Sequence, residues 1–176
     1  MRTLLLTGAI VAGFYVAHAA TAGDGSLIRA TLDARSRAWS CADHLGIPRR
    51  PSTDSFRRRA ASLAYRKWVY RLWDGRARAR CGLLARLRSD PRAAICFVFG
   101  PVCAEALHVA ACETGETFST RAANGQYRGL FQMGEWARSR YGHADDALGQ
   151  ARAAHRLYRD EGWSQWECSP RGAFRD

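Results

Sequence analysis

The sequence is poor in acidic residues and contains almost no lysine. It has 27 basic residues against 16 acidic ones, and Lys67 is its only lysine, so arginine carries nearly all of the formal net charge of +11. A positive balance of this size is typical of nucleic-acid-binding proteins. The export signal described below argues against a nucleic-acid partner, and we expect none. Anionic cell-envelope polymers suit an exported cationic protein better; an arginine-rich solvated surface without a ligand is the alternative.

Patterns typical of a metal site are missing. The six cysteines include no Cys-x-x-Cys pair, and the five histidines show no ligand spacing. Zinc sites need such clustered sulfur and nitrogen ligands. We therefore expect neither a metal nor another cofactor.

Long apolar runs are lacking except at the start of the chain. "LLLTGAIVAGFYVA", residues 4–17, follows a short basic start and is shorter than the roughly 20 residues that a membrane span needs. Ala17, His18 and Ala19 form a small-x-small cleavage site. We expect residues 1–19 to be a signal peptide and the remainder, with no second apolar segment of spanning length, to be a soluble monomer that is secreted or cell-wall associated. An uncleaved N-terminal anchor is the alternative.

The cysteines all lie beyond this signal. An even number of cysteines in an oxidising compartment favours up to three disulfides over a reactive thiol. Six cysteines allow 15 pairings, so the spacing alone leaves the connectivity open. The cysteines concerned are Cys41, Cys81, Cys96, Cys103, Cys112 and Cys168.

Helical periodicity dominates the exported chain and predicts a mainly α fold. Residues 26–45 form the first expected helix, and a loop over residues 46–53 follows. Good N-cap residues near Asp54 predict a second helix, antiparallel to the first, that extends to about Leu87. Its expected buried stripe is Phe56, Ala60, Leu63, Ala64, Trp68 and Leu72. Residues 20–93 are thus predicted to be an arginine-rich helical segment of unknown role.

The composition changes after Pro91, where arginine becomes rarer and apolar residues commoner. We expect residues 94–176 to form a separate domain. Gly100 and Pro101 interrupt an apolar segment, and Pro101 suits the first turn of a new helix. That helix is predicted to run to Gly115, which can supply a left-handed C-cap.

Turn and cap residues also mark the end of the chain. Asn124 and Gly125 predict a turn in a loop-rich stretch without a convincing strand. A pair of aspartates ending at Asp146 can cap a last helix over residues 147–161, which Gly162 ends. The expected buried face of this helix consists of Ala147, Ala151, Ala154 and Tyr158.

Glu113 falls in the last turn of the predicted helix before Gly115. The helix dipole disfavours a negative charge there, and a partly apolar environment adds a desolvation cost, so both effects raise the carboxyl pKa. A carboxylic acid that stays protonated near neutral pH can act as a general acid. From periodicity alone, an ordinary exposed glutamate at a helix end explains this residue better.

Three segments, taken together, favour a catalytic role for Glu113 over an ordinary exposed glutamate. "ACETG" (residues 111–115), "NGQYRGLFQM" (124–133) and "WSQWEC" (163–168) resemble the lysozyme-like superfamily of bacterial cell-wall enzymes. More narrowly, they are similar to soluble lytic transglycosylase and resuscitation-promoting-factor type domains. The resemblance covers about residues 94–169 and implies a lysozyme-like fold there.

The resemblance assigns roles by position. Glu113 matches the catalytic acid. The segment that lines the family's cleft matches Gly129, Leu130 and Gln132, its turn matches Asn124, Gly125 and Tyr127, and its closing residues match Trp163, Trp166 and Cys168. The chain departs from the pattern at Arg128, which stands in place of a small residue next to an insertion of one residue, and at Thr114, where serine is commoner.

The same resemblance implies a disulfide pairing. It suggests Cys112–Cys168, with Cys96–Cys103 as a short local loop. Cys41 then remains for Cys81, a bridge that two antiparallel helices allow only if the second helix bends back.

The implied reaction is cleavage of the β-1,4 bond between N-acetylmuramic acid and N-acetylglucosamine in peptidoglycan glycan strands. Glu113 would protonate the glycosidic oxygen. A second carboxylate is not evident, although Glu116 and Glu135 are candidates by proximity in the sequence. A single acid fits the lytic transglycosylase route, which the resemblance favours.

Several polar and aromatic residues are candidates for substrate binding. Gln126 and Gln132 could bind acetamido groups, and aromatic side chains could stack on sugar rings. Those aromatic candidates are Tyr127, Phe131, Trp136 and Tyr158. For Phe131 and Tyr158, burial in the core is the better explanation.

Two other classes of protein compete with an enzyme. One is a non-catalytic lysozyme-like protein that only binds peptidoglycan. The other is a disulfide-stapled structural or inhibitor protein in which the match is coincidental. The second alternative predicts that Glu113 and Gln132 do not converge on one concave surface.

Overall fold

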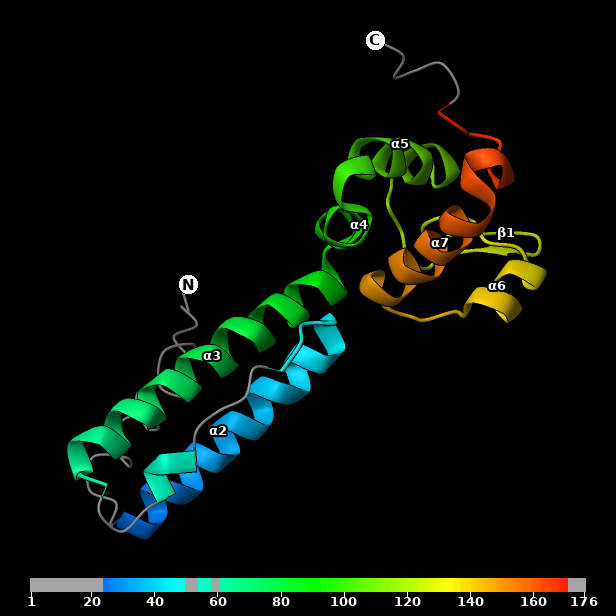
Figure 1. Ribbon diagram of the computed structural model, residues 1–176. Helices are drawn as coiled ribbons and strands as arrows, with labels where there is room; N and C mark the ends of the chain where they lie inside the picture. The colour runs from blue at the N-terminus through cyan, green and yellow to red at the C-terminus, as the bar shows by residue number, and fades with distance from the viewer. Residues whose placement is uncertain (1–23, 50–53, 58–60, 171–176) are drawn as a thin grey trace, which may run out of the picture. The chain divides into compact units, whose positions relative to one another are not determined.

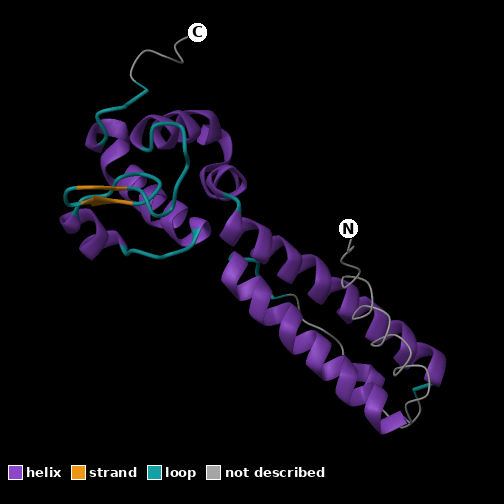
Figure 2. Ribbon diagram, turned by 180° about the vertical axis from the view of Figure 1, so that it is seen from behind, coloured by secondary structure: helices purple, strands orange, loops and turns teal. Residues whose placement is uncertain are grey.

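The computed structural model describes residues 24–49, 54–57 and 61–170; the predicted signal peptide lies outside these residues. The chain is mainly helical, as the sequence predicts (Figure 2). Contacts within the chain divide it into two compact units, with the division between Leu84 and Ala85.

The first unit contains the long helix α2 (Asp24–Leu45) and most of the long helix α3 (Leu63–Ser89), whose last residues lie beyond the division. A short 3-10 helix, η1 (Asp54–Arg57), lies between them in the sequence. The two helices lie side by side and run parallel (Figure 1), so the predicted antiparallel arrangement is wrong. The start of α3 therefore lies beside the start of α2, and residues 46–62 connect the end of one helix to the start of the other. An extended chain covers about 3.3 Å per residue against 1.5 Å in a helix, so a connection of this length can return along α2.

Helix α3 begins at Leu63, about nine residues later than predicted. Ser62 caps it, because its Oγ accepts a hydrogen bond from the Tyr65 N–H at 3.2 Å. Leu63 and Trp68 of the predicted buried stripe are 52% and 57% exposed. The buried cluster of this unit is Ala34, Ala38, Phe56, Val69, Trp73 and Ala77. Apolar and aromatic residues occur around the whole of α3, so periodicity did not single out the face that contacts α2.

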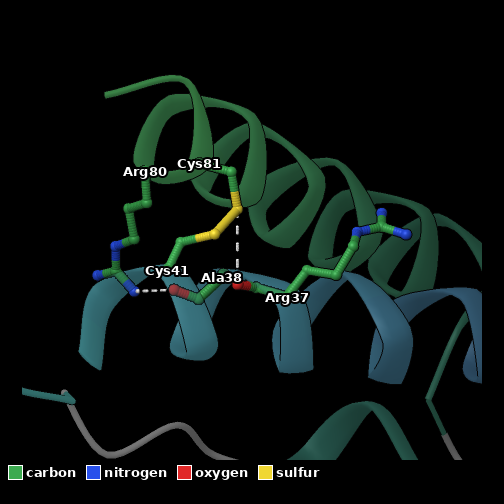
Figure 3. The surroundings of a disulfide bond; sticks show 5 residues. All are labelled: Arg37, Ala38, Cys41, Arg80 and Cys81. Atoms are coloured by element: carbon green, nitrogen blue, oxygen red, sulfur yellow. Dashed lines mark hydrogen bonds between the residues drawn. A yellow bond between two sulfur atoms is a disulfide. The ribbon is translucent and has the colours of Figure 1, made fainter. Parts of the chain in front are cut away.

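The disulfide Cys41–Cys81 joins the two helices (Figure 3), with Cα atoms 5.2 Å apart. Because α2 and α3 run parallel, the late part of one lies beside the late part of the other, and the bridge needs no reversal of α3. Beside it, Arg80 extends from α3 to α2 and donates a hydrogen bond from Nη1 to the Ala38 carbonyl oxygen at 3.4 Å.

The second unit contains most of the shorter elements. Their bounds are α4 (Pro91–Phe99), η2 (Gly100–Val102), α5 (Cys103–Glu113), β1 (Ala123–Asn124), β2 (Tyr127–Arg128), α6 (Glu135–Tyr141), α7 (Ala147–Glu161) and η3 (Gly162–Gln165). The predicted break at Gly100 and Pro101 is confirmed. Asn124 and Gly125 form the predicted turn, but it connects two short antiparallel strands that the sequence analysis missed.

Two helix starts illustrate local capping. The Asp146 carboxylate accepts a hydrogen bond from the Gly149 N–H at 2.7 Å, so the predicted cap of α7 is confirmed. The Asp90 carboxylate accepts from the Ala93 N–H at 3.0 Å, and Pro91 at the first helical position starts α4. Pro91 therefore begins a helix rather than only ending α3, as its fixed φ allows. Helix α6 was not predicted.

The core of this unit lies between α4, α5 and α7. Ala147, Ala151 and Ala154 are completely buried, as predicted, and these small side chains let α7 approach its neighbours closely. Phe99 stacks on Phe131 with ring centroids 5.4 Å apart. Phe131 thus belongs to the core.

Residues Pro91–Glu113 correct one expectation. By length and composition this stretch is apolar enough to cross a membrane, although we expected no second segment of this kind. The stretch forms three segments, α4, η2 and α5, because Gly100 and Pro101 interrupt it. Ile95, Phe99 and Val109 from these segments are buried in the core of the unit.

The second unit contains two disulfides. Cys96–Cys103 connects α4 to the start of α5, and Cys112–Cys168 connects the end of α5 to the segment after η3. Together with Cys41–Cys81, these are the three pairs that the resemblance implies.

Candidate functional site

Glu113 is the last residue of α5, where the chain turns sharply. The Glu116 N–H donates to the Ala111 carbonyl oxygen at 2.6 Å and the Gly115 N–H to that of Cys112 at 3.3 Å. These two bonds form a Schellman motif, and Gly115 adopts the left-handed φ of 57° that the motif needs. The predicted glycine cap is therefore confirmed, and the helix ends beside the candidate acid.

Thr114 holds the turn after Glu113 in place. Its hydroxyl donates to the Ala110 carbonyl oxygen at 2.7 Å and accepts from the Phe118 N–H at 3.0 Å. A serine hydroxyl could make the same bonds. The departure from the family pattern at this position therefore leaves the turn chemistry unchanged.

Glu113 opens into a pocket of about 180 Å³. Its lining consists of Glu113, Asn124, Tyr127, Gln132, Gln165, Trp166 and Glu167. An adjacent pocket of about 260 Å³ shares Tyr127, Gln132, Gln165 and Trp166 with it and adds Gln126 and Trp136, among others. Glu113 and Gln132 thus converge on one concave surface, contrary to what a coincidental match predicts.

The environment of Glu113 favours the protonated carboxylic acid. Partial burial raises the pKa of this carboxyl, a hydrogen bond from the backbone N–H of Cys168 lowers it, and the negative charge of Glu167 raises it again; the net result is a raised pKa. Desolvation and a like charge both disfavour the carboxylate. The side chain is thus suited to hold a proton that it can donate.

Gln132 lines the pocket and carries a side-chain acceptor that has no hydrogen-bond partner. The side chain is only 9% exposed, and its Nε2 donates to the Gly129 carbonyl oxygen at 2.9 Å. Its Oε1 is buried without a hydrogen-bond partner. A buried, unpaired acceptor is costly, and a ligand N–H in the pocket would satisfy it.

The segment before Gln132 is held by Gln150 of α7. The Gln150 Oε1 accepts from the Leu130 N–H at 2.9 Å, and its Nε2 donates to the carbonyl oxygens of Thr120 and Ala144 at 2.9 and 2.8 Å. Gly129 has a φ of 80°, and a Cβ there would lie 2.4 Å from the Gln150 Oε1. Only glycine therefore allows this close approach. Gln150 is a polar residue within the otherwise apolar buried face of α7. That position in the helix pattern could have predicted its role, which we did not predict.

The remaining predicted residues are placed differently. Tyr127 and Trp136 are 45% and 57% exposed at the pockets, so their rings are accessible to a ligand. Gly129 and Leu130 line neither pocket. Leu130 is completely buried. Tyr158 also lies outside both pockets and packs on Trp163 with centroids 4.3 Å apart.

A second acid, Glu167, was not identified from the sequence. It lines the same pocket as Glu113, whereas Glu116 faces a different pocket and Glu135 lines only the adjacent one. Glu167 precedes Cys168, just as Glu113 follows Cys112, so the disulfide between these cysteines brings the two acids together. The Cys112–Cys168 pairing that the resemblance implies could have predicted the position of Glu167.

Across residues 24–49, 54–57 and 61–170, no group of His, Cys, Asp and Glu side chains could hold a metal ion. Comparisons with protein-family models, with curated proteins and with solved structures found no significant match for this chain.

Proposed function

We propose that the chain is an exported, lysozyme-like enzyme that cleaves the β-1,4 bond between N-acetylmuramic acid and N-acetylglucosamine in peptidoglycan. The observation that carries this proposal is the pocket shared by Glu113, Asn124, Tyr127 and Gln132. Each of these residues matches the family pattern, and Glu113 comes from a different segment of the sequence than the other three. A helix-terminal glutamate with a raised pKa is the chemical group that the reaction requires.

Glu113 acts first as general acid. It donates its proton to the glycosidic oxygen while the bond from that oxygen to the sugar C1 breaks and positive charge develops at C1. The Gln132 Oε1 accepts a hydrogen bond from a substrate acetamido N–H, which satisfies the unpaired buried acceptor. Tyr127 and Trp136 offer exposed rings on which sugar faces stack.

The second half of the reaction follows the lytic transglycosylase route. The muramic acid 6-hydroxyl oxygen bonds to C1 and gives its proton to the Glu113 carboxylate, so that a 1,6-anhydro product forms and no water is consumed. Glu167 supports the first step, because its negative charge helps to keep Glu113 protonated. In a hydrolase, Glu167 would instead serve as the second carboxylate that the two-acid schemes need.

Digestion of purified peptidoglycan, with the products analysed by mass spectrometry, tests the proposal. We expect anhydromuropeptides from the protein without its signal peptide, and a loss of at least about 100-fold in the Glu113→Gln variant, the lower end of what general acid–base catalysis contributes. Glu116→Gln is the matched control, because Glu116 lies three residues away and does not line the Glu113 pocket. It should keep full activity.

Other products would change the conclusion. Reducing-end muropeptides that disappear in both Glu113→Gln and Glu167→Gln would identify a two-carboxylate hydrolase. No products, together with retained binding to peptidoglycan, would identify a non-catalytic wall-binding protein and refute the enzymatic proposal.

A further inference from the structure

The helical pair of the first unit contains a pocket of its own, of about 230 Å³. Its lining consists of Trp39 from α2 and Trp73, Arg76 and Arg80 from α3. The three residues of α3 are spaced by three and four positions, so they lie on one face of that helix. Nothing in the proposed reaction uses these residues.

The side chains around this pocket offer hydrogen-bond donors and no acceptor. Arg76 and Arg80 each carry a guanidinium group, which only donates. The Trp39 indole Nε1–H is a donor too, and it is buried without a hydrogen-bond partner. Such a set of groups is complementary to a ligand rich in acceptors and negatively charged.

Carboxylates of the protein do not neutralise the two arginines. Asp74, the only acid in α3, pairs instead with Arg78 at 2.7 Å and with Arg37 at 3.9 Å. Within the described part of the chain, Arg76 and Arg80 have no carboxylate within 4 Å. Their charge is therefore available to a ligand.

The walls of the pocket are held in position before any ligand binds. Trp73 is only 3% exposed, and its ring meets that of Trp39 edge-on at 5.6 Å. The Arg76 guanidinium lies 4.9 Å from the centre of the Trp73 ring. Arg80 is anchored by its hydrogen bond to the Ala38 carbonyl oxygen, next to the interhelical disulfide (Figure 3). Ordering these groups in advance reduces the entropy lost on binding.

We propose that this pocket binds an oxyanion, a carboxylate or a phosphate, carried by a small organic or sugar body that rests against the indole rings. The oxyanion accepts hydrogen bonds from the Trp39 Nε1–H and from the Arg76 and Arg80 guanidinium groups, which can each bind it through two parallel N–H groups. The site is independent of the proposed enzymatic function and would be present in a non-catalytic protein as well.

NMR of the ¹⁵N-labelled protein tests the binding directly. Each of the six tryptophans contributes one indole N–H signal, and Trp39→Phe identifies the signal of Trp39 by its loss. Glycerol 3-phosphate and N-acetylmuramic acid are the organic probes, with inorganic phosphate and acetate as the bare ions. We expect a saturable downfield shift of the Trp39 signal, tighter for an organic probe than for its bare ion. The tighter of the two organic probes distinguishes a phosphate source from a carboxylate source.

Charge-matched double variants separate a specific site from general attraction to a basic helix. Arg76→Gln with Arg80→Gln removes two pocket cations four positions apart. Lys67→Gln with Arg71→Gln removes two exposed cations with the same spacing on α3 that do not line the pocket. We expect the first pair to weaken binding at least about tenfold, the effect of losing one charge-assisted hydrogen bond. The second pair should change it less than about twofold.

Trp39→Phe keeps an aromatic ring in place and removes the N–H donor together with part of the indole surface. It should weaken binding, as read from the Trp73 indole signal, while thermal unfolding shows that the variant remains folded. Equal losses from the two double variants, or no saturable shift up to about 50 mM of any probe, far above a millimolar Kd, would overturn the proposal.

Discussion

Replacement of Gln150 by leucine tests whether this buried amide holds the segment that leads to Gln132. The side chain is 5% exposed and makes three hydrogen bonds, to the Leu130 N–H and to the carbonyl oxygens of Thr120 and Ala144. Leucine has a similar volume, although its side chain is one bond shorter, and it fills most of the same space. The change therefore removes hydrogen bonds with little change in packing.

The magnitude follows from the three backbone groups that lose their partner. Each buried group left unsatisfied costs about 1–3 kcal/mol. The hydrogen bond to the Leu130 N–H is buried, whereas the bonds to the two carbonyl oxygens are only partly buried. Water can therefore bind these two oxygens in the variant and offset part of the lost free energy. We expect the free energy of unfolding to fall by about 3–5 kcal/mol, a large share of the 5–14 kcal/mol or so expected for a unit of about 90 residues.

Urea unfolding followed by circular dichroism measures this loss. Gln165→Leu is the control, because Gln165 is exposed and surface changes usually stay within about 0.5 kcal/mol. Hydrogen exchange of the Leu130 amide should also become faster in Gln150→Leu. A loss below about 1 kcal/mol, or unchanged protection of that amide, would refute the role of Gln150 as the support of this segment.

Two further predictions concern the surroundings of Glu113. Removing the negative charge with Glu167→Gln should lower the Glu113 pKa, and the alkaline limb of the pH–activity profile should move to lower pH because the general acid then loses its proton earlier. Glu161→Gln, an exposed control, should leave the profile in place. An unshifted limb in Glu167→Gln would contradict the coupling between the two acids. Replacing Cys112 and Cys168 with alanine opens a loop with a sequence separation of 56. By the chain-entropy relation, this should lower the free energy of unfolding by about 4 kcal/mol. Urea unfolding measures the change, and a loss below about 1 kcal/mol would show that the bridge contributes little.

The local features of the second unit were predictable from neighbouring residues. Gly115, Asp146 and Gly162 act at helix ends through bonds to residues within about five positions, so the sequence alone specifies them. Gly100 and Pro101 interrupt the apolar segment for the same kind of local reason. The position of Glu113 at a helix end could therefore be predicted before its surroundings were known.

The family pattern supplied what periodicity could not. Glu113 lies 14 positions before Tyr127 and 19 before Gln132, and no local rule predicts that it shares a pocket with them. Their order along the chain suggested a common site, and the structure brings them together. Tyr158, in contrast, was a candidate for substrate binding for which the sequence already favoured burial in the core, and it lies in an aromatic cluster.

Only the tertiary structure decided the features that depend on contacts between distant segments. These features include the parallel direction of α2 and α3 and the exposure of Trp68. They also include the hydrogen bonds from Gln150 to the segment before Gln132 and the position of Glu167 in the same pocket as Glu113. Helix ends are determined by dihedral angles and hydrogen bonds within a few residues, which the sequence by itself specifies. A buried face or a paired acid is determined by which distant surface is covered, and that choice depends on packing of the whole unit and on disulfides whose partners the spacing leaves open.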